Sequence, residues 1–92
     1  MLFADRIKTA REELNIPQKK IAEALGIDVP MYSRLERGER PAKREQVVTI
    51  AKHLGIDEKE LIHLWLAEKV LNIVSEEEDA NTVLNIVSNI ID

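Results

Sequence analysis

The 92-residue chain contains no cysteine, so neither a disulfide framework nor a thiolate metal site can form. It also lacks an apolar run that approaches the roughly 20 residues of a membrane-spanning helix. No N-terminal signal peptide is visible, because Asp5 and Arg6 interrupt the apolar start of the chain. These absences predict one small cytoplasmic domain that does not bind a membrane. A core of this size is marginal, which favours compact helices and dimerisation.

An excess of positive charge is missing as well, since the net charge is −4, and this argues at first against a nucleic-acid partner. The charge is unevenly divided, however. Residues 1–56 hold 11 Lys and Arg against 8 Asp and Glu, a net charge of +3, whereas residues 57–92 hold 2 against 9, a net charge of −7. Charges within a Debye length of a phosphate backbone matter most, so the basic half can bind DNA while the acidic half faces away.

Two short helices joined by a tight turn are predicted within residues 18–38. The first spans residues 18–25, with apolar residues at helical spacing, and Gly26 follows where a helix end favours a left-handed residue. Asp28 is a suitable N-cap for the second helix, which is expected to run to about Arg37. This is the helix-turn-helix pattern, whose second helix enters the major groove of DNA.

The remaining helices follow from the same periodicity. They are expected at residues 3–14, 43–54, 58–74 and 76–91. The spacing from Ser75 to Glu78 resembles a capping box and places the start of the last helix there, with one continuous helix from residue 58 onward as the alternative. The helix at 58–74 is apolar nearly all round, so one face can cover a core and another requires a further partner.

Four features of the sequence occur together in an ordered set. They are Gln18, the run IAEALGI at residues 21–27, SRLERG at residues 33–38 and LGI at residues 54–56. With them, the segment from about Arg6 to Leu61 resembles the helix-turn-helix domain of the phage-repressor and Cro family, the Xre-type regulators. The resemblance implies an all-α fold, with a five-helix DNA-binding domain at residues 1–64 around the motif at 18–38. Residues 65–92 then form a C-terminal helical extension, expected to serve dimerisation.

The resemblance also assigns residues to DNA contacts. Arg34, in the middle of the second motif helix, is the candidate for reading a base, because a guanidinium fits O6 and N7 of guanine. A solvated arginine or a phosphate contact is the alternative. Gln18 opens the first motif helix, from which relatives reach the phosphate backbone, and a helix N-terminus suits phosphate. Arg40, Lys43 and Arg44 flank the start of the next helix and are expected to contact phosphates as a set.

The first turn of the second motif helix departs from the family pattern. Val29, Pro30 and Met31 stand where many relatives carry polar readers, and they either pack on thymine methyl groups or only shape the helix start. Because Pro30 has no backbone N–H, the Asp28 carboxylate is expected to accept from Met31. Ser33 is a candidate contact to a base or a phosphate. The full set of expected DNA contacts is Gln18, Val29, Pro30, Met31, Ser33, Arg34, Arg37, Arg40, Lys43 and Arg44.

Other polar and aromatic residues are expected to be structural. Arg11 and Glu36 match a pair that forms a partly buried salt bridge in relatives of this family. His53 and His63 lie on different predicted helices without carboxylate or cysteine partners, so no metal site, catalytic residue or cofactor is expected. Trp65 is expected to anchor the core or an interface.

The sequence therefore predicts a transcriptional regulator without enzymatic activity, which binds a double-stranded DNA operator as a homodimer through residues 65–91. The long helix, with LIHLWLAEKV at residues 61–70, is similar to that of regulators that accompany restriction–modification genes. Two alternatives stay open. One is an antitoxin whose C-terminal helices bind a toxin as protein partner. The other is an interaction module that keeps the fold without binding DNA, which the net charge favours and Arg34 opposes.

Overall fold

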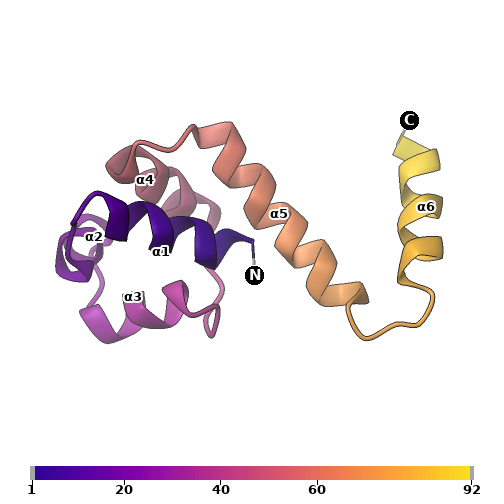
Figure 1. Cartoon of the computed structure of the whole chain (residues 1–92), viewed down its shortest axis with the longest axis horizontal. Coiled ribbons are helices and arrows are strands. Elements are labelled where there is room, and N and C mark those ends of the chain that lie inside the picture. The colour runs from indigo at the N-terminus through magenta and orange to yellow at the C-terminus, as the bar shows by residue number, and fades with distance from the viewer. Residues whose placement is uncertain (1, 92) are drawn as a thin grey trace.

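A computed structural model describes residues 2–91, and over this range the chain consists of six α-helices without a strand (Figure 1). The helices are α1 (Phe3–Glu13), α2 (Gln18–Leu25), α3 (Val29–Glu36), α4 (Arg44–Leu54), α5 (Glu58–Val74) and α6 (Ala80–Ile91). The prediction of an all-α fold is confirmed. Met1 and Asp92, which end the predicted domain and the predicted extension, lie outside the described residues.

One hydrophobic core joins α1 to α4 and the first half of α5. Its fully buried large side chains come from all five helices: Ile7, Ile21, Tyr32, Leu35, Val47, Ile50 and Leu61. Each occupies a position that the helical periodicity directs inward, and burying one such aliphatic side chain contributes about 1.5–3 kcal/mol. The core therefore holds the helix-turn-helix segment against three other helices.

The turn between α2 and α3 has the expected local chemistry. Gly26 is left-handed, with φ of +69°, and the Ile27 N–H donates to the Ala22 carbonyl at 3.1 Å. Asp28 then caps α3, because its Oδ1 accepts a hydrogen bond from the Met31 N–H at 2.8 Å. The predicted cap at this residue is confirmed, and the turn fixes the direction in which α3 leaves α2.

Helix boundaries agree with the prediction within about one residue, except at α6. Ser75 keeps helical backbone angles and ends α5, and the Glu77 N–H donates to the Val74 carbonyl at 3.0 Å. The predicted capping box at Ser75 is therefore wrong, and α6 begins at Ala80 rather than Glu76. The end of α5 explains the difference, because Ser75 and the Glu77 N–H are already used to close that helix and cannot start the next one.

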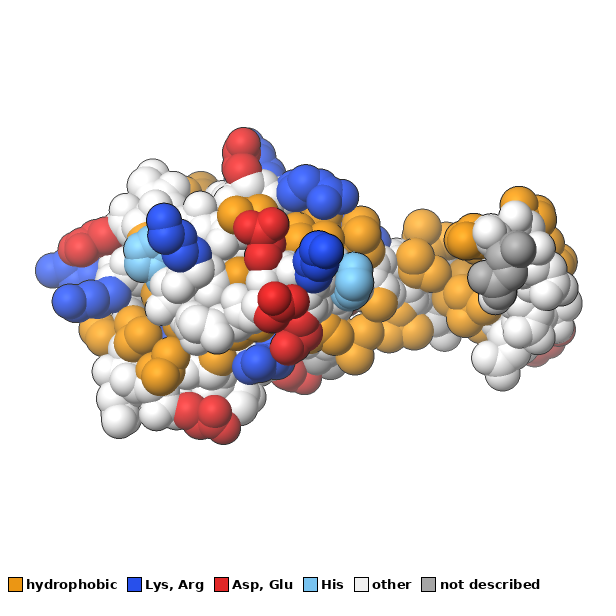
Figure 2. Space-filling view, turned by 90° about the horizontal axis from the view of Figure 1, so that it is seen from above, with side chains coloured by type: hydrophobic (Ala, Val, Ile, Leu, Met, Phe, Trp, Pro, Cys, Tyr) orange, Lys and Arg blue, Asp and Glu red, His pale blue; other side chains and the backbone are white. Residues whose placement is uncertain are grey.

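The two C-terminal helices are separate, which excludes the alternative of one continuous helix. Leu61 and Trp65 face the core from the first half of α5, and beyond Trp65 the helix extends past the five-helix body (Figure 1). Helix α6 contains no buried residue and stands apart from the body. In Figure 2, charged side chains are scattered over the body, whereas hydrophobic side chains gather along the segment that projects from it.

Candidate nucleic-acid interface

Helix α3 has an inner and an outer face. Tyr32, Leu35 and Glu36 are buried against the core, and they leave the opposite side of the helix at the surface. The outer residues are Val29, Pro30, Arg34 and Arg37, which are exposed, and Met31 and Ser33, which are half-buried. All six are predicted DNA contacts. A helix held in this way can present its outer face to a major groove.

At the end of α3, hydrogen bonds join the side chains of Ser33, Arg37 and Glu39. The Arg37 guanidinium donates from Nη1 to Ser33 Oγ at 2.6 Å and from Nε to Glu39 Oε2 at 2.7 Å. Hydrogen bonding from Arg37 also lowers the pKa of the Glu39 carboxyl. Glu39 is therefore a carboxylate beside two predicted DNA contacts, which the sequence patterns did not single out. By contrast, Arg34 is exposed and forms no ion pair within residues 2–91.

The predicted phosphate contacts Arg40, Lys43 and Arg44 are all exposed, and they lie on the loop after α3 and on the first residue of α4. The Lys43 backbone N–H donates to Gln46 Oε1 at 2.9 Å, which ties the end of this loop to the first turn of α4. The loop and the helix start thus carry three exposed cations within eight residues of the end of α3. Such a set is suited to phosphate oxygens on either side of a groove.

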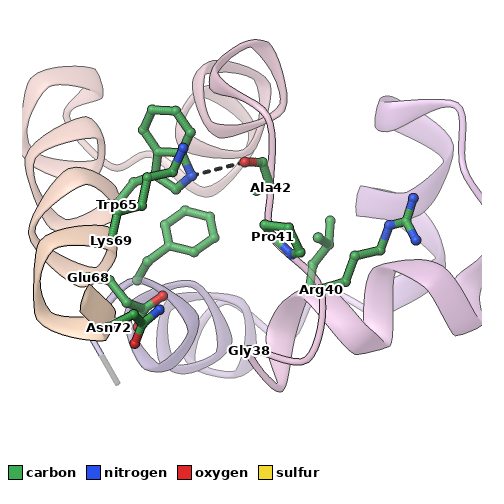
Figure 3. A pocket seen from close by; sticks show the side chains of 10 residues that line it. Gly38, Arg40, Pro41, Ala42, Trp65, Glu68, Lys69 and Asn72 are labelled. Carbon is green, nitrogen blue, oxygen red and sulfur yellow. Dashed lines mark hydrogen bonds between the residues drawn. The ribbon is translucent and has the colours of Figure 1, made fainter. Parts of the chain in front are cut away.

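Trp65 holds this loop in place from α5. Its indole Nε1 donates to the Ala42 carbonyl at 3.0 Å, and the Trp65 side chain is almost completely buried (Figure 3). The Lys69 Nζ lies 3.8 Å from the ring centre, and the Arg44 Cζ lies 5.4 Å from it. Cations over an indole face are attracted by its quadrupole, so the ring also positions Arg44.

A cavity of about 140 Å³ lies beside Trp65, between α5 and the loop (Figure 3). Phe3, Glu68 and Asn72 contribute to its wall, and the buried Glu68 Oε1 has no hydrogen-bond partner among residues 2–91. In Figure 3, the Arg40 side chain points away from Trp65 and Glu68. The cavity therefore separates α5 from the loop that carries Arg40, and only the Trp65–Ala42 hydrogen bond is drawn across it.

Glu36 is a buried carboxylate with several donors around it. Arg11 donates to it from Nε at 2.6 Å and from Nη2 at 3.0 Å, while its Nη1 donates to the Ile16 carbonyl at 2.8 Å. Burial alone would raise the pKa of Glu36, but the hydrogen bonds from Arg11 and Gln18 and the positive charge of Arg11 outweigh it and lower the pKa. Burial and the neighbouring Glu36 raise the pKa of Tyr32, so its hydroxyl stays protonated.

Gln18 belongs to this same cluster, because its Nε2 donates to Glu36 Oε1 at 3.2 Å. Its side chain is half-buried at the first residue of α2. Because the side chain is bonded to Glu36, a phosphate contact at this helix start would use the backbone N–H of Gln18. The side chain links α2 to α3, which the sequence alone did not indicate.

Neither a metal site nor a membrane-spanning helix is found within residues 2–91. No group of three or more His, Asp or Glu side chains there is arranged to hold a metal ion. His53 Nδ1 lies 3.0 Å from the Thr49 carbonyl one turn earlier, a local contact along α4. No helix in that range is long and apolar enough to span a membrane.

Comparison with known proteins agrees with this geometry. A family model described as helix-turn-helix matches residues 7–61. The cryptic phage CTXphi transcriptional repressor RstR of Vibrio cholerae serotype O1 is 30% identical over 69 residues, which are 75% of this chain. The aligned part is 62% of that repressor, so the chain spans less than two thirds of its relative. No solved structure matches the chain significantly.

Proposed function

The chain belongs to the helix-turn-helix family of the Xre and Cro type, and we propose that it is a sequence-specific DNA-binding transcriptional regulator. The outer face of α3 carries the proposal. It presents an exposed Arg34 at mid-helix, and the cations Arg40, Lys43 and Arg44 follow on the adjoining loop and helix start. In this arrangement Arg34 reads a guanine edge and the three flanking cations bind phosphates.

The regulator acts as a homodimer on an operator of two-fold symmetry. The support is the apolar surface of residues 65–91, which the five-helix body does not cover. Two copies related by a two-fold axis would place their α3 helices in successive major grooves, about 34 Å apart. The acidic bend at residues 76–79 lies at the far end of α5, away from the five-helix body (Figure 1), which keeps its negative charge at a distance from α3.

Two kinds of regulated genes are candidates: restriction–modification genes and the genes of a toxin–antitoxin pair. Control of restriction–modification genes is supported by the length of α5, which continues 13 residues beyond the matched family segment. An antitoxin would use the same exposed apolar surface to bind a toxin, and purification as a complex of two different proteins would favour it. The helix-turn-helix family supports a binding role rather than catalysis for either candidate.

The proposed function is tested by comparing how Arg34→Ala and Lys43→Ala change the affinity for operator and for scrambled DNA. An operator is first obtained by selecting bound sequences from random DNA. Arg34→Ala should then weaken operator binding by about 1–3 kcal/mol for each base contact and weaken binding to scrambled DNA much less. Lys43→Ala should weaken both and reduce the salt dependence by about one unit of slope per protomer. Titrations at several salt concentrations separate these effects.

Lys59→Ala is the matched control, because it removes one exposed lysine at the start of α5, on the opposite side of the domain from α3 (Figure 1). It should change neither affinity nor slope. If Arg34→Ala weakens operator and scrambled DNA equally, Arg34 contacts phosphate and does not read a base. If random DNA yields no bound sequence at all, the proposed function is wrong.

A further inference from the structure

Two apolar surfaces remain uncovered on the C-terminal helices. On α5, the stripe formed by Leu66, Val70 and Ile73 is 40%, 46% and 77% exposed. On α6, the exposed face consists of Val83, Ile86, Val87, Ile90 and Ile91. An apolar surface of this extent is unusual on a monomer and marks an interaction site.

Beyond Trp65, the chain buries only one residue of α5 with its own side chains. Val74, in the last turn of the helix, is 5% exposed, whereas the stripe of Leu66, Val70 and Ile73 is open along its length. The two helices diverge from the bend at residues 76–79 and form a V in Figure 1. Packed helices lie about 8–10 Å apart, so an open V leaves space for another helix.

The charge pattern limits what can occupy the V. Helix α6 carries no charged residue between Ala80 and Ile91, whereas the bend before it carries four acidic residues in succession. An apolar, uncharged helix fits these two surfaces, because it can cover them without placing a further negative charge near the bend. Within the described chain, α6 itself has this chemistry, so a second copy supplies a suitable helix.

The apolar residues of the two surfaces have the same spacing along their helices, which suits the packing of α6 from one copy against α5 of another. Leu66, Val70 and Ile73 follow one another at intervals of four and three residues, and Val83, Val87 and Ile90 repeat the same intervals. Two helices that pack side by side with such spacing can align every apolar residue of one with an apolar residue of the other. The pairs would be Leu66 with Val83, Val70 with Val87, and Ile73 with Ile90.

We propose that two copies of the chain exchange their α6 helices, each α6 packing into the V of the partner copy and onto its α5 stripe. This rests on the homodimer proposed above and defines its geometry. In the exchanged dimer the two V shapes open toward each other, so the two acidic bends lie at opposite ends of α6. A helix of 12 residues separates them by about 18 Å, well beyond a Debye length of roughly 8 Å.

Engineered cysteines test the exchange cleanly, because the natural chain has none. In the full-length Val70→Cys/Val87→Cys variant, both substitutions replace exposed residues, so the fold should persist. Mild oxidation should give a covalent dimer of about twice 10.5 kDa on a non-reducing gel. An intramolecular disulfide, which leaves a monomer band, would overturn the exchange.

The control variant is Val70→Cys/Asn85→Cys, because Asn85 lies on the polar side of α6, away from Val87. Its covalent-dimer band should be at least several-fold weaker than that of the test variant. Equal bands from the two variants would mean random collision and would overturn the exchange. A monomer by sedimentation without covalent dimer also overturns it and assigns the surface to a different protein.

Operator binding by the same samples separates this inference from the proposed function. A non-covalent dimer that binds operator but forms only the intramolecular disulfide would overturn the exchange and leave the regulator intact. If the unsubstituted chain does not bind operator DNA, the proposed regulator function is wrong, whatever the cysteine variants show.

Discussion

Removing Arg11 is expected to destabilise the domain more than removing its partner Glu36. The Glu36 side chain is 2% exposed and the Arg11 side chain is 13% exposed. Arg11→Ala leaves a buried carboxylate with the Gln18 amide as its remaining hydrogen-bond donor at 3.2 Å, so it should cost about 3–5 kcal/mol. A chain of this length is stabilised by roughly 5–14 kcal/mol in total, which makes that loss large.

Glu36→Ala should cost less, about 1–3 kcal/mol, for a geometric reason. Arg11 keeps its hydrogen bond to the Ile16 carbonyl at 2.8 Å, and its partly exposed guanidinium can reach water. The double variant Arg11→Met/Glu36→Leu replaces both charges with apolar side chains and should be more stable than Arg11→Ala.

The measurement is urea unfolding, followed by helical circular dichroism at one fixed protein concentration, because dimerisation adds to apparent stability. Lowering the pH adds a second readout. The pKa of Glu36 is below its ordinary value of 4.5, so its stabilising contribution is present above that pH and is lost as the pH falls through the folded pKa. Arg11→Ala should therefore lose the acid-sensitive part of this stability. An Arg11→Ala cost below about 1 kcal/mol, or equal costs for Arg11→Ala and Glu36→Ala, would refute the reasoning.

Two further predictions concern the loop and the operator. Trp65→Phe keeps an aromatic ring but leaves the buried Ala42 carbonyl without its donor, so it should cost about 1–3 kcal/mol of stability and weaken binding to operator and scrambled DNA alike. Urea unfolding and gel shifts on both DNAs check it, and a fully stable variant would contradict the assigned hydrogen bond. Inserting about half a helical turn of DNA between the half-sites should abolish dimeric binding in a gel shift, and unchanged affinity would contradict the two-fold docking.

The sequence predicts those parts of the fold that depend on neighbours along the chain. Gly26 marks the turn before α3 through its left-handed backbone conformation. Asp28 marks it through a cap to Met31, three residues later. The start of α6 fails because Ser75 and Glu78 have the spacing of a cap, yet α5 continues through Ser75. A local signal cannot show that the preceding helix already occupies the residue.

The candidate site is less predictable, because its contacts join residues far apart in the sequence. Exposure of Arg34 follows from the helical period, but the Trp65 hydrogen bond spans 23 residues to Ala42. The engagement of Ser33 and Arg37 with each other depends on side-chain conformations that no pattern encodes. Gln18 likewise needs the approach of α2 to α3 before its contact to Glu36 can be seen.

Helix α5 connects the two halves of the proposed function. Its first part holds the loop of Arg40 through the hydrogen bond from Trp65, and its second part leaves Leu66, Val70 and Ile73 exposed for the proposed partner. Because these two surfaces lie on one continuous helix of 17 residues, about 25 Å long, the position of the partner is rigidly related to the position of the loop. In the proposed dimer, the distance between the two α3 helices is therefore set by α5 rather than by the flexible parts of the chain. Trp65 is therefore the residue through which the proposed dimer surface would be connected to the loop proposed to contact DNA.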